Sequence, residues 1–292
     1  MGGPKRGSPA LLELIRLRQA SSYGAGPGLD QALDVCRRLA AYGMASTIGY
    51  WAPDQPARVV ADIYIASFDR LAAEDLDCYV SIKLSALGFD AALLAEVKAA
   101  AARSGRRLHL DALQPKAAET TLSLLEALTR PGPLGTTLPG RWRRSLEDSS
   151  RAIDLGLSIR VVKGQWADKA DGKVDPARGF LDVVDRLHGY RGGVGVATHN
   201  TRLLSESLRR LTSSGTPCEA ELLLGLPFRG PLLAARELGV PVRVYVMYGA
   251  VGSNYGIPDL VAHPATVWWL VQDLLWGRDK TWRSIGASQA GR

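Results

Sequence analysis

The feature that most constrains the fold is a series of eight short strand-like segments, each followed by room for a helix. The segments span residues 45–50, 79–85, 108–112, 134–139, 158–163, 194–199, 219–224 and 242–247. Successive segments begin roughly 23 to 36 residues apart, enough for one strand, one helix and two loops. Eight such units in a chain of 292 residues predict an α/β fold, a single (β/α)8 TIM-type barrel.

The rival architecture is a doubly wound sheet, which usually has a glycine-rich turn after its first strand. Residues 50–54 follow the first segment here and contain no glycine. Gly24, Gly26 and Gly28 precede a helical pattern but follow no strand, so they are a weak dinucleotide fingerprint. We therefore expect a barrel over residues 31–285, with a helical N-terminal arm (1–30) and a disordered tail (286–292).

Charge and cysteine usage narrow the function classes. A net charge of +7 and a pI near 9.4 allow an anionic partner such as a nucleotide cofactor. The densest basic cluster (Arg141, Arg143, Arg144) is not extended into a basic face with several aromatics, so no nucleic-acid binding is expected. Three cysteines without paired spacing favour reduced thiols and a cytoplasmic location. The first 20 residues hold no apolar run of membrane-spanning length, and no integral membrane segment is expected.

Barrel enzymes place their chemistry at the carboxyl ends of the strands. Polar residues gather there in this chain: Lys83, Asp111, Tyr245, the run at 163–166 and the run at 198–200. Asp111 either faces the barrel mouth or caps the following helix, and the strand alone does not decide between them. Arg160 stands inside an apolar strand and requires a partner, because an unpaired buried guanidinium is costly. That partner is a carboxylate such as Asp111 or Glu219, or an electron-rich ligand.

Other catalytic signatures are missing from the sequence. No second His or Cys lies at metal-ligand spacing, and no nucleophile elbow or phosphate-binding P-loop motif occurs, so no metal site is expected. Lys83 and Lys163 both lie near strand ends, which leaves a Schiff-base aldolase barrel open as an alternative.

Five motifs together resemble the flavin-dependent proline dehydrogenase family. They are SIKLSAL (81–87), LDA (110–112), IRVVKG (159–164), ATHN (197–200) and VRVYV (242–246), which occur in the family's order. The resemblance covers roughly residues 45–276. It implies a distorted barrel that binds FAD without a Rossmann domain and oxidises an amine C–N bond to an imine. A small-molecule amine and an unidentified electron acceptor would then be the partners.

The resemblance also implies roles for individual residues. Arg160 matches a position beside the flavin N5 and O4 region, where a cation stabilises the reduced ring. Catalytic roles fall to Arg160, Asp111, Lys83 and Tyr245. Cofactor-binding positions are Ala112, Pro139, Arg160, Lys163, Gly164, Gln165, Trp166, Thr198, His199, Asn200 and Glu219. Substrate-binding positions are Lys83, Asp111, Tyr245, Trp269, Gln272 and Asp273.

The chain departs from the family pattern in its last helical segment. The family carries two adjacent arginines there that bind the proline carboxylate, whereas this chain has Gln272 and Asp273. Pro139 also replaces a flavin-contacting glutamine, and Trp166 a tyrosine. An amide and a carboxylate cannot replace a bidentate guanidinium clamp. We therefore expect an amine substrate that lacks the usual free carboxylate; a non-catalytic flavin- or ligand-binding barrel is the second hypothesis.

Overall fold

Eight parallel strands close into a barrel in the computed structural model, which describes residues 24–51, 54–111, 114–128, 132–226 and 228–250. Neighbours in the barrel are neighbours in the sequence, and β8 pairs with β1 to close the sheet. The strands are β1 (Ala45–Trp51), β2 (Cys78–Ile82), β3 (Leu108–Leu110), β4 (Leu134–Pro139), β5 (Ser158–Val162), β6 (Val194–Ala197), β7 (Cys218–Leu223) and β8 (Val242–Gly249). The predicted (β/α)8 barrel is confirmed.

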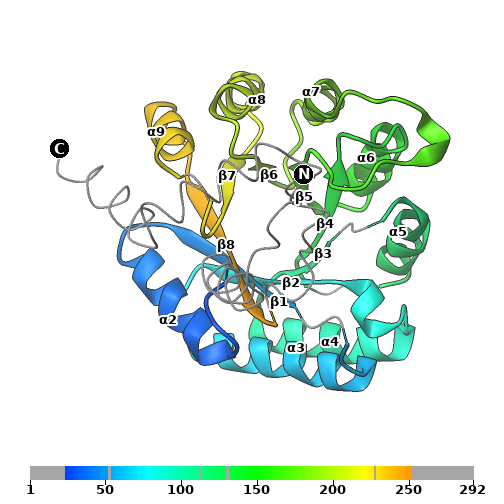
Figure 1. Cartoon of the computed structure of the whole chain (residues 1–292), viewed down its shortest axis with the longest axis vertical. Helices are drawn as coiled ribbons and strands as arrows, with labels where there is room; N and C mark the ends of the chain where they lie inside the picture. The colour runs from blue at the N-terminus through cyan, green and yellow to red at the C-terminus, as the bar shows by residue number, and fades with distance from the viewer. Residues whose placement is uncertain (1–23, 52–53, 112–113, 129–131, 227, 251–292) are drawn as a thin grey trace, which may run out of the picture.

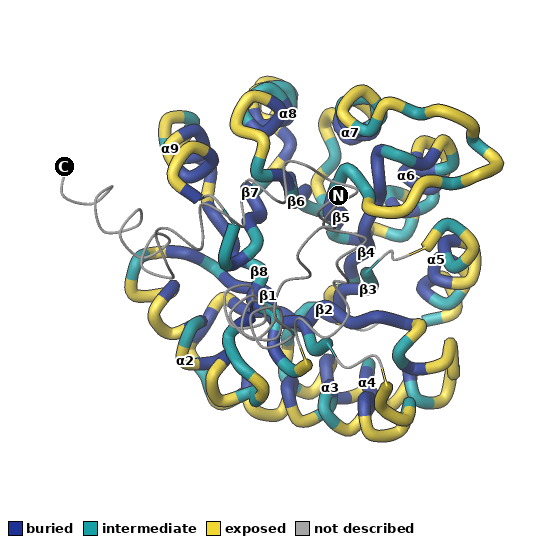
Figure 2. Tube along the Cα trace, viewed as in Figure 1, coloured by how far each residue is buried: buried dark blue, intermediate teal, exposed yellow. Residues whose placement is uncertain are grey.

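Helices surround the barrel as a ring (Figure 1). They are α2 (Leu29–Ala40), α3 (Ala57–Ala72), α4 (Ala91–Ser104), α5 (Ala118–Ala127), α6 (Ser145–Asp154), α7 (Pro176–Arg186), α8 (Thr201–Ser213) and α9 (Arg229–Glu237), with short 3-10 turns η1 (Leu84–Leu87), η2 (Pro115–Ala117) and η3 (Lys169–Asp171). Figure 2 shows their inner faces buried and their outer faces exposed. α2 precedes the first strand and packs on β8 and β1, between α9 and α3.

Local sequence signals explain where several helices begin and end. The Asp90 carboxylate accepts hydrogen bonds from the first turn of α4, at 2.8 Å from Ala92 N and 3.1 Å from Leu93 N. The same helix ends at Gly105, whose φ of 66° is a left-handed conformation that glycine adopts without strain. Asp175 caps α7 in the same way and is followed by a proline at the first helical position.

The strands bury apolar side chains outward and polar side chains inward. Outward-facing valines and leucines of the strands join the helices in one continuous apolar core. The inward side is unusual, because it holds buried polar and charged groups, among them His109, Arg160, Glu221 and Arg243. The barrel interior is thus a polar layer enclosed by an apolar shell.

Strand glycines make room for those polar side chains. A Cβ added at Gly195 would lie 2.7 Å from Glu221 Oε1, and one added at Gly135 would lie 2.5 Å from His109 Nδ1. A Cβ at Gly49 would lie 2.2 Å from Tyr245 Oη. Such approaches are closer than van der Waals contact allows, so a larger residue at any of these positions would displace the polar side chain beside it.

The described chain begins at the barrel mouth. Gly24 forms a parallel bridge with Met247 of β8, and Ala25 N donates to Met247 O at 2.8 Å. The arm before residue 24 and the tail 286–292 lie outside the described residues, and so does the last helical segment, which contains Gln272 and Asp273. The proposed domain boundaries remain predictions. None of the described helices has the length and apolar character needed to cross a membrane.

Candidate active site

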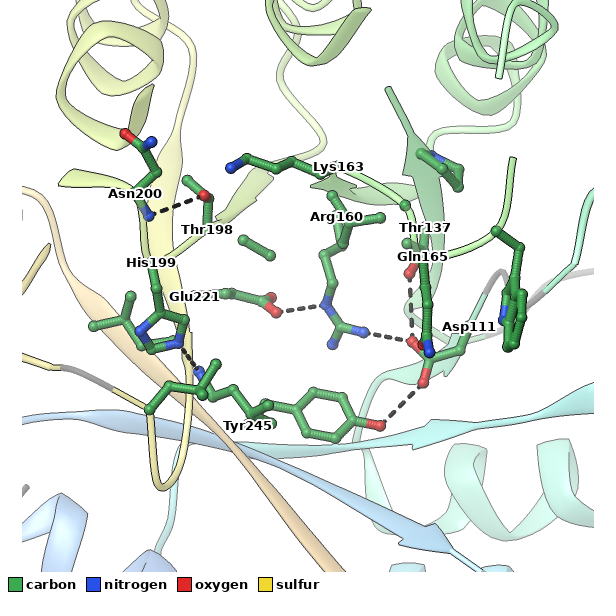
Figure 3. Close-up of a pocket in the computed structure, with 18 of the residues that line it drawn as sticks. Asp111, Thr137, Arg160, Lys163, Gln165, Thr198, His199, Asn200, Glu221 and Tyr245 are labelled. Atoms are coloured by element: carbon green, nitrogen blue, oxygen red, sulfur yellow. Dashed lines mark hydrogen bonds and ion pairs between the residues drawn. The ribbon is translucent and has the colours of Figure 1, made fainter. Parts of the chain in front are cut away.

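A cavity of about 600 Å³ lies at the carboxyl ends of the strands (Figure 3). Its volume is in the range of small-molecule and cofactor pockets. The sequence-predicted residues that line it are Lys83, Asp111, Pro139, Arg160, Lys163, Gly164, Gln165, Trp166, Thr198, His199, Asn200 and Tyr245. These residues come from β2 to β6, from the loops that follow those strands, and from β8, so only the closed barrel brings them together.

Arg160 lies at the floor of the cavity, between two carboxylates. Its Nε donates to Glu221 Oε2 at 2.5 Å, and its Nη1 donates to Asp111 Oδ1 at 2.6 Å (Figure 3). Nη2 donates to Tyr79 Oη at 2.8 Å, and that hydroxyl donates onward to Glu221 Oε1 at 2.6 Å. Nη1 also donates to Ser81 Oγ at 3.2 Å. Only 4% of the Arg160 side chain is exposed, and protein groups rather than water satisfy almost all of its hydrogen-bonding capacity. The cation is therefore rigid and permanently charged.

Asp111 is the carboxylate that faces the cavity. Burial alone would raise its pKa, but the charges of Arg160 and Lys83 outweigh burial and hold the pKa of Asp111 below its usual value. Tyr245 Oη donates to Asp111 Oδ2 at 3.0 Å, and Thr137 Oγ1 lies 3.4 Å from Oδ1. Asp111 is thus an oriented carboxylate at neutral pH, and it does not cap the helix that follows.

Lys83 and Tyr245 complete the polar floor. Lys83 Nζ lies 3.7 Å from Asp111 Oδ2 and 5.2 Å from the ring centroid of Trp51. Burial lowers the pKa of Lys83; the nearby Asp111 carboxylate opposes this effect, and Arg160 adds to it. Burial and the Asp111 charge raise the pKa of Tyr245 well above its ordinary value, so its hydroxyl stays protonated and donates. The three groups converge on one point within the cavity.

The outer part of the cavity is suited to anions. Lys163 lies on one side, and the amino end of α8 lies on the other, with Asn200 as its cap (Asn200 Oδ1 to Leu203 N, 3.0 Å). A helix amino end carries partial positive charge and free N–H groups, which bind phosphate well. His199 Nε2 accepts from Leu223 N at 2.8 Å, which fixes the ring in the wall. Thr198 Oγ1 accepts from Asn200 N at 3.2 Å.

The loop after β5 approaches the cavity closely. Gly164 has φ +88°, and a Cβ there would lie 2.8 Å from the Cβ of Pro139. Trp142 is buried, and its indole Nε1 donates to Trp166 O at 2.7 Å, which ties the loop to the turn after β4. The Trp166 side chain remains 45% exposed at the rim. The backbone here is placed to contact a ligand directly.

Similarity to individual known proteins points to the proline dehydrogenases. No protein-family model matches the chain. A proline dehydrogenase 1 from Bacillus subtilis subsp. natto is 25% identical over 275 residues, which cover 88% of this chain and 90% of the relative. A proline dehydrogenase from Deinococcus radiodurans is 27% identical, with 92% and 95% covered. The chain is thus similar to proline dehydrogenases over about nine tenths of its length. The resemblance drawn from the five motifs is confirmed.

The solved structures add evidence for the fold. Proline utilization A (PutA) from Bdellovibrio bacteriovorus superimposes with a TM-score of 0.71 at 18% identity, covering 90% of this chain. This chain spans about a third of the length of that PutA chain, 33%. At this identity the likeness establishes the shared barrel and nothing finer.

The structure separates one predicted site residue from the rest and adds another. Glu219 does not line the cavity; its Oε1 accepts from Arg243 Nε at 2.8 Å, nearer the start of the barrel. Glu221, two residues later, is the carboxylate that pairs with Arg160. Strand pairing places Arg160 of β5 level with Gly195 of β6, and Gly195 level with Glu219 of β7. Because the strands tilt, neighbouring strands are offset by about one residue along the barrel axis, so Arg160 meets Glu221 rather than Glu219. Glutamates at 219 and 221 both face inward, and only the register of the barrel distinguishes them.

Four predicted residues lie outside the described part of the chain: Ala112, Trp269, Gln272 and Asp273. Among the described residues, no three His, Cys, Asp or Glu side chains gather as a metal site would require. Thr137, which lines the cavity beside Asp111, had no signal in the sequence except its place on the fourth strand.

Proposed function

We propose that the protein is an FAD-dependent dehydrogenase that oxidises an amine C–N bond to an imine. The observation that carries the proposal is the constellation at the cavity floor, in which Asp111 accepts from both Arg160 and Tyr245 and lies beside Lys83. A carboxylate held ionised beside a buried cation can bind a protonated amine and accept its proton. The similarity of the chain to proline dehydrogenases supports the same chemistry.

The residues present fit FAD. Lys163 and the amino end of α8 offer the charge and N–H groups that a pyrophosphate needs, and Gly164 leaves its backbone accessible. Arg160, at the cavity floor, would supply the positive charge that stabilises the edge of a reduced isoalloxazine ring. FAD bound there would supply the acceptor for the hydride that leaves the carbon next to nitrogen.

The protein side chains would prepare the substrate for that reaction. Asp111 orients the substrate nitrogen and takes up its proton, and Tyr245 holds Asp111 in place by donating to its second oxygen. Arg160 keeps Asp111 ionised and stabilises negative charge that develops near it. Lys83, buried against Trp51, forms a wall of the pocket and limits which substituents fit.

The substrate class follows from the sequence departure at residues 272 and 273. We infer that the substrate is a proline-like or other amine without a free carboxylate at the usual place, because Gln272 and Asp273 stand where the family has its two arginines. Loss of a bidentate, charge-assisted contact and gain of a like charge should cost about 3 kcal/mol, or about a hundredfold in affinity. Pyrrolidine or a proline ester brings no anion and avoids this penalty.

Anaerobic flavin reduction tests this proposal directly. The purified protein is mixed with L-proline, L-proline methyl ester or pyrrolidine, and the loss of visible flavin absorbance is followed. We expect the two analogues without a carboxylate to reduce the flavin at concentrations about a hundredfold below those that L-proline requires. The double variant Gln272→Arg, Asp273→Arg should recover reduction by L-proline. Ready reduction by L-proline in the unaltered protein would refute the altered substrate and leave the family assignment intact.

The two other hypotheses have distinct outcomes in the same preparation. Yellow protein that no amine bleaches would favour a flavin-binding barrel without turnover. The lowered pKa of Lys83 is the observation that favours a Schiff-base aldolase, since it raises the fraction of neutral amine. Colourless protein that borohydride crosslinks to a carbonyl substrate, with loss of the crosslink in Lys83→Met, would support that alternative.

A further inference from the structure

A second cavity lies below the Arg160 layer, at the end of the barrel where the strands begin. It has a volume of about 200 Å³, and its lining includes Arg107, His109, Ser158 and Glu219. Arg160 and Glu221 line both this cavity and the larger one above, so one layer of side chains separates them. The rim includes Pro217, which is exposed, so solvent water can reach this lower cavity.

A direct hydrogen bond joins a residue of the upper cavity to a residue of the lower one. Thr137 lines only the upper cavity and His109 only the lower one, and His109 Nε2 lies 2.9 Å from Thr137 Oγ1. On the upper side, Thr137 Oγ1 donates to Asp111 Oδ1 at 3.4 Å. Asp111, Thr137 and His109 therefore form an unbroken chain of proton-carrying groups from the candidate catalytic carboxylate to the lower cavity.

The far end of this chain lacks a protein partner. His109 is 1% exposed, and its Nδ1 is a buried polar atom without a hydrogen bond to any described residue. Gly135 leaves the space beside Nδ1 free, since a Cβ there would lie 2.5 Å from it. A buried imidazole nitrogen without a partner is costly unless water satisfies it. The lower cavity is large enough to hold water, and charged side chains such as Arg107 and Glu219 form part of its lining.

We propose that Thr137 and His109 relay the proton released from the substrate nitrogen out of the active site to water in the lower cavity. The inference rests on the proposed amine oxidation, in which the protonated amine loses one proton from nitrogen and a hydride from carbon as the C=N bond forms. The hydride carries both electrons to the bound cofactor, and the proton goes to Asp111 Oδ1. Asp111 passes it to Thr137, Thr137 passes its own proton to His109 Nε2, and Nδ1 releases a proton to water.

The electrostatics of the layer favour a relay over a resting base. Arg160 and Lys83 hold the pKa of Asp111 low, so a proton does not stay there. Burial, together with the charges of Arg160, Arg107 and Arg243, lowers the pKa of His109 well below its ordinary value. The imidazole therefore stays neutral and transfers a proton by changing tautomer. The observed pattern, with Thr137 donating to Asp111, is the one that follows the transfer, and return of the ring to the other tautomer completes the cycle.

Two substitutions at Thr137 separate relay from packing. Thr137→Val keeps the shape and removes the hydroxyl, whereas Thr137→Ser keeps the hydroxyl. Ser158→Ala is the matched control in the lower cavity. Among the described residues, Ser158 Oγ hydrogen-bonds to Gly192 O alone, at 3.0 Å, and it takes no part in the relay. We expect Thr137→Val to slow anaerobic flavin reduction by an amine about tenfold or more, Thr137→Ser to restore most of the rate, and Ser158→Ala to react like the unaltered protein.

Isotope effects identify the step that changes. In Thr137→Val, the solvent deuterium effect should rise and the effect of deuterium on the substrate carbon should fall, because proton release becomes limiting. Equal rates and isotope effects in Thr137→Val and the unaltered protein would overturn the relay. So would equal slowing in Thr137→Val and Thr137→Ser, which would indicate packing alone.

A measurement without turnover keeps the relay separate from the proposed reaction. The chain has four histidines, so nitrogen-15 NMR of labelled histidine can be assigned with a His109→Gln variant. We expect a neutral His109 whose Nε2 signal changes in Thr137→Val but not in Ser158→Ala. An unaltered protein that no amine reduces would refute the proposed function, whereas a His109 signal insensitive to Thr137→Val would refute the relay itself.

Discussion

Replacing Arg160 with methionine removes the cation on which the cavity floor depends. The side chain donates to Glu221, Asp111, Ser81 and Tyr79, at distances from 2.5 to 3.2 Å. Methionine is similar in length but cannot donate, so two buried carboxylates lose their shared partner. Breaking a buried ion pair from one side costs about 3–5 kcal/mol, because an uncompensated charge remains. Arg160→Met should therefore lower the melting temperature by roughly 6 °C or more.

The destabilisation should depend on pH, with a sign that follows from Asp111. In the unaltered protein the pKa of Asp111 is lowered, so its stabilising contribution is present above its unfolded pKa and is lost as pH falls through the lower folded value. Without Arg160, burial is no longer outweighed, and we expect the folded pKa to rise above the unfolded one. The variant then loses stability as the pH rises above about 4, which is the ordinary pKa of an aspartate. The difference between the two proteins should grow between pH 5 and pH 7.

Thermal unfolding at pH 5 and pH 7, with the visible spectrum recorded on the same samples, tests this reasoning. Arg160→Met should also retain less flavin or show a lower flavin reduction potential. Arg37→Met is a suitable control, since Arg37 is an ion-paired but exposed arginine whose loss should have a small effect. A pH-independent change of the same size as the control, with normal flavin content and reduction kinetics, would show that Arg160 does not have the role assigned to it.

Three further substitutions test separate parts of the cavity. Tyr245→Phe removes the donor to Asp111 Oδ2, so it should lower the free energy of unfolding by about 1–3 kcal/mol and slow flavin reduction by an amine. An unchanged reduction rate would exclude a role for the hydroxyl. Gly164→Ala adds a Cβ 2.8 Å from that of Pro139 at a φ of +88°, so flavin content should fall, as measured by absorbance after gel filtration. Asn200→Ala removes the cap of α8, so it should lower the free energy of unfolding by about 1 kcal/mol in a denaturant titration and weaken flavin binding. An unchanged flavin affinity would show that this helix end does not bind the phosphates.

The fold could be predicted from the sequence because strand and helix signals alternate without interruption. The strand at Leu134–Pro139 was predicted at both ends, and the other strands differ from expectation by at most three residues at an end. The larger differences lie at strand ends such as β2, where the chain turns into η1 directly after Lys83. Propensity cannot locate such an end, because the hydrogen bonds that define it come from neighbouring strands.

The site could be predicted in part, and the reason for the missing part is geometric. Barrel enzymes place their chemistry at the carboxyl ends of the strands, so Lys83, Asp111 and Tyr245 could be named as candidates from position. The direction in which Asp111 points had to come from the structure. The choice between Glu219 and Glu221 depends on the offset between strands, which no local pattern contains. His109 shares a face of the third strand with Asp111, two residues on, but its contact with Thr137 requires the pairing of β3 with β4.

The charged layer inside the barrel has a consequence for how the chain folds. Arg160 is 49 residues from Asp111, 61 from Glu221 and 79 from Ser81 along the sequence. An intermediate that contains only the first or the second half of the barrel would bury some of these charges without their partners, which is unfavourable. Such intermediates should keep the unfinished barrel open and hydrated until the last strands arrive, so closure would be a late and cooperative event. A purely apolar interior would impose no such order, since its halves could collapse separately.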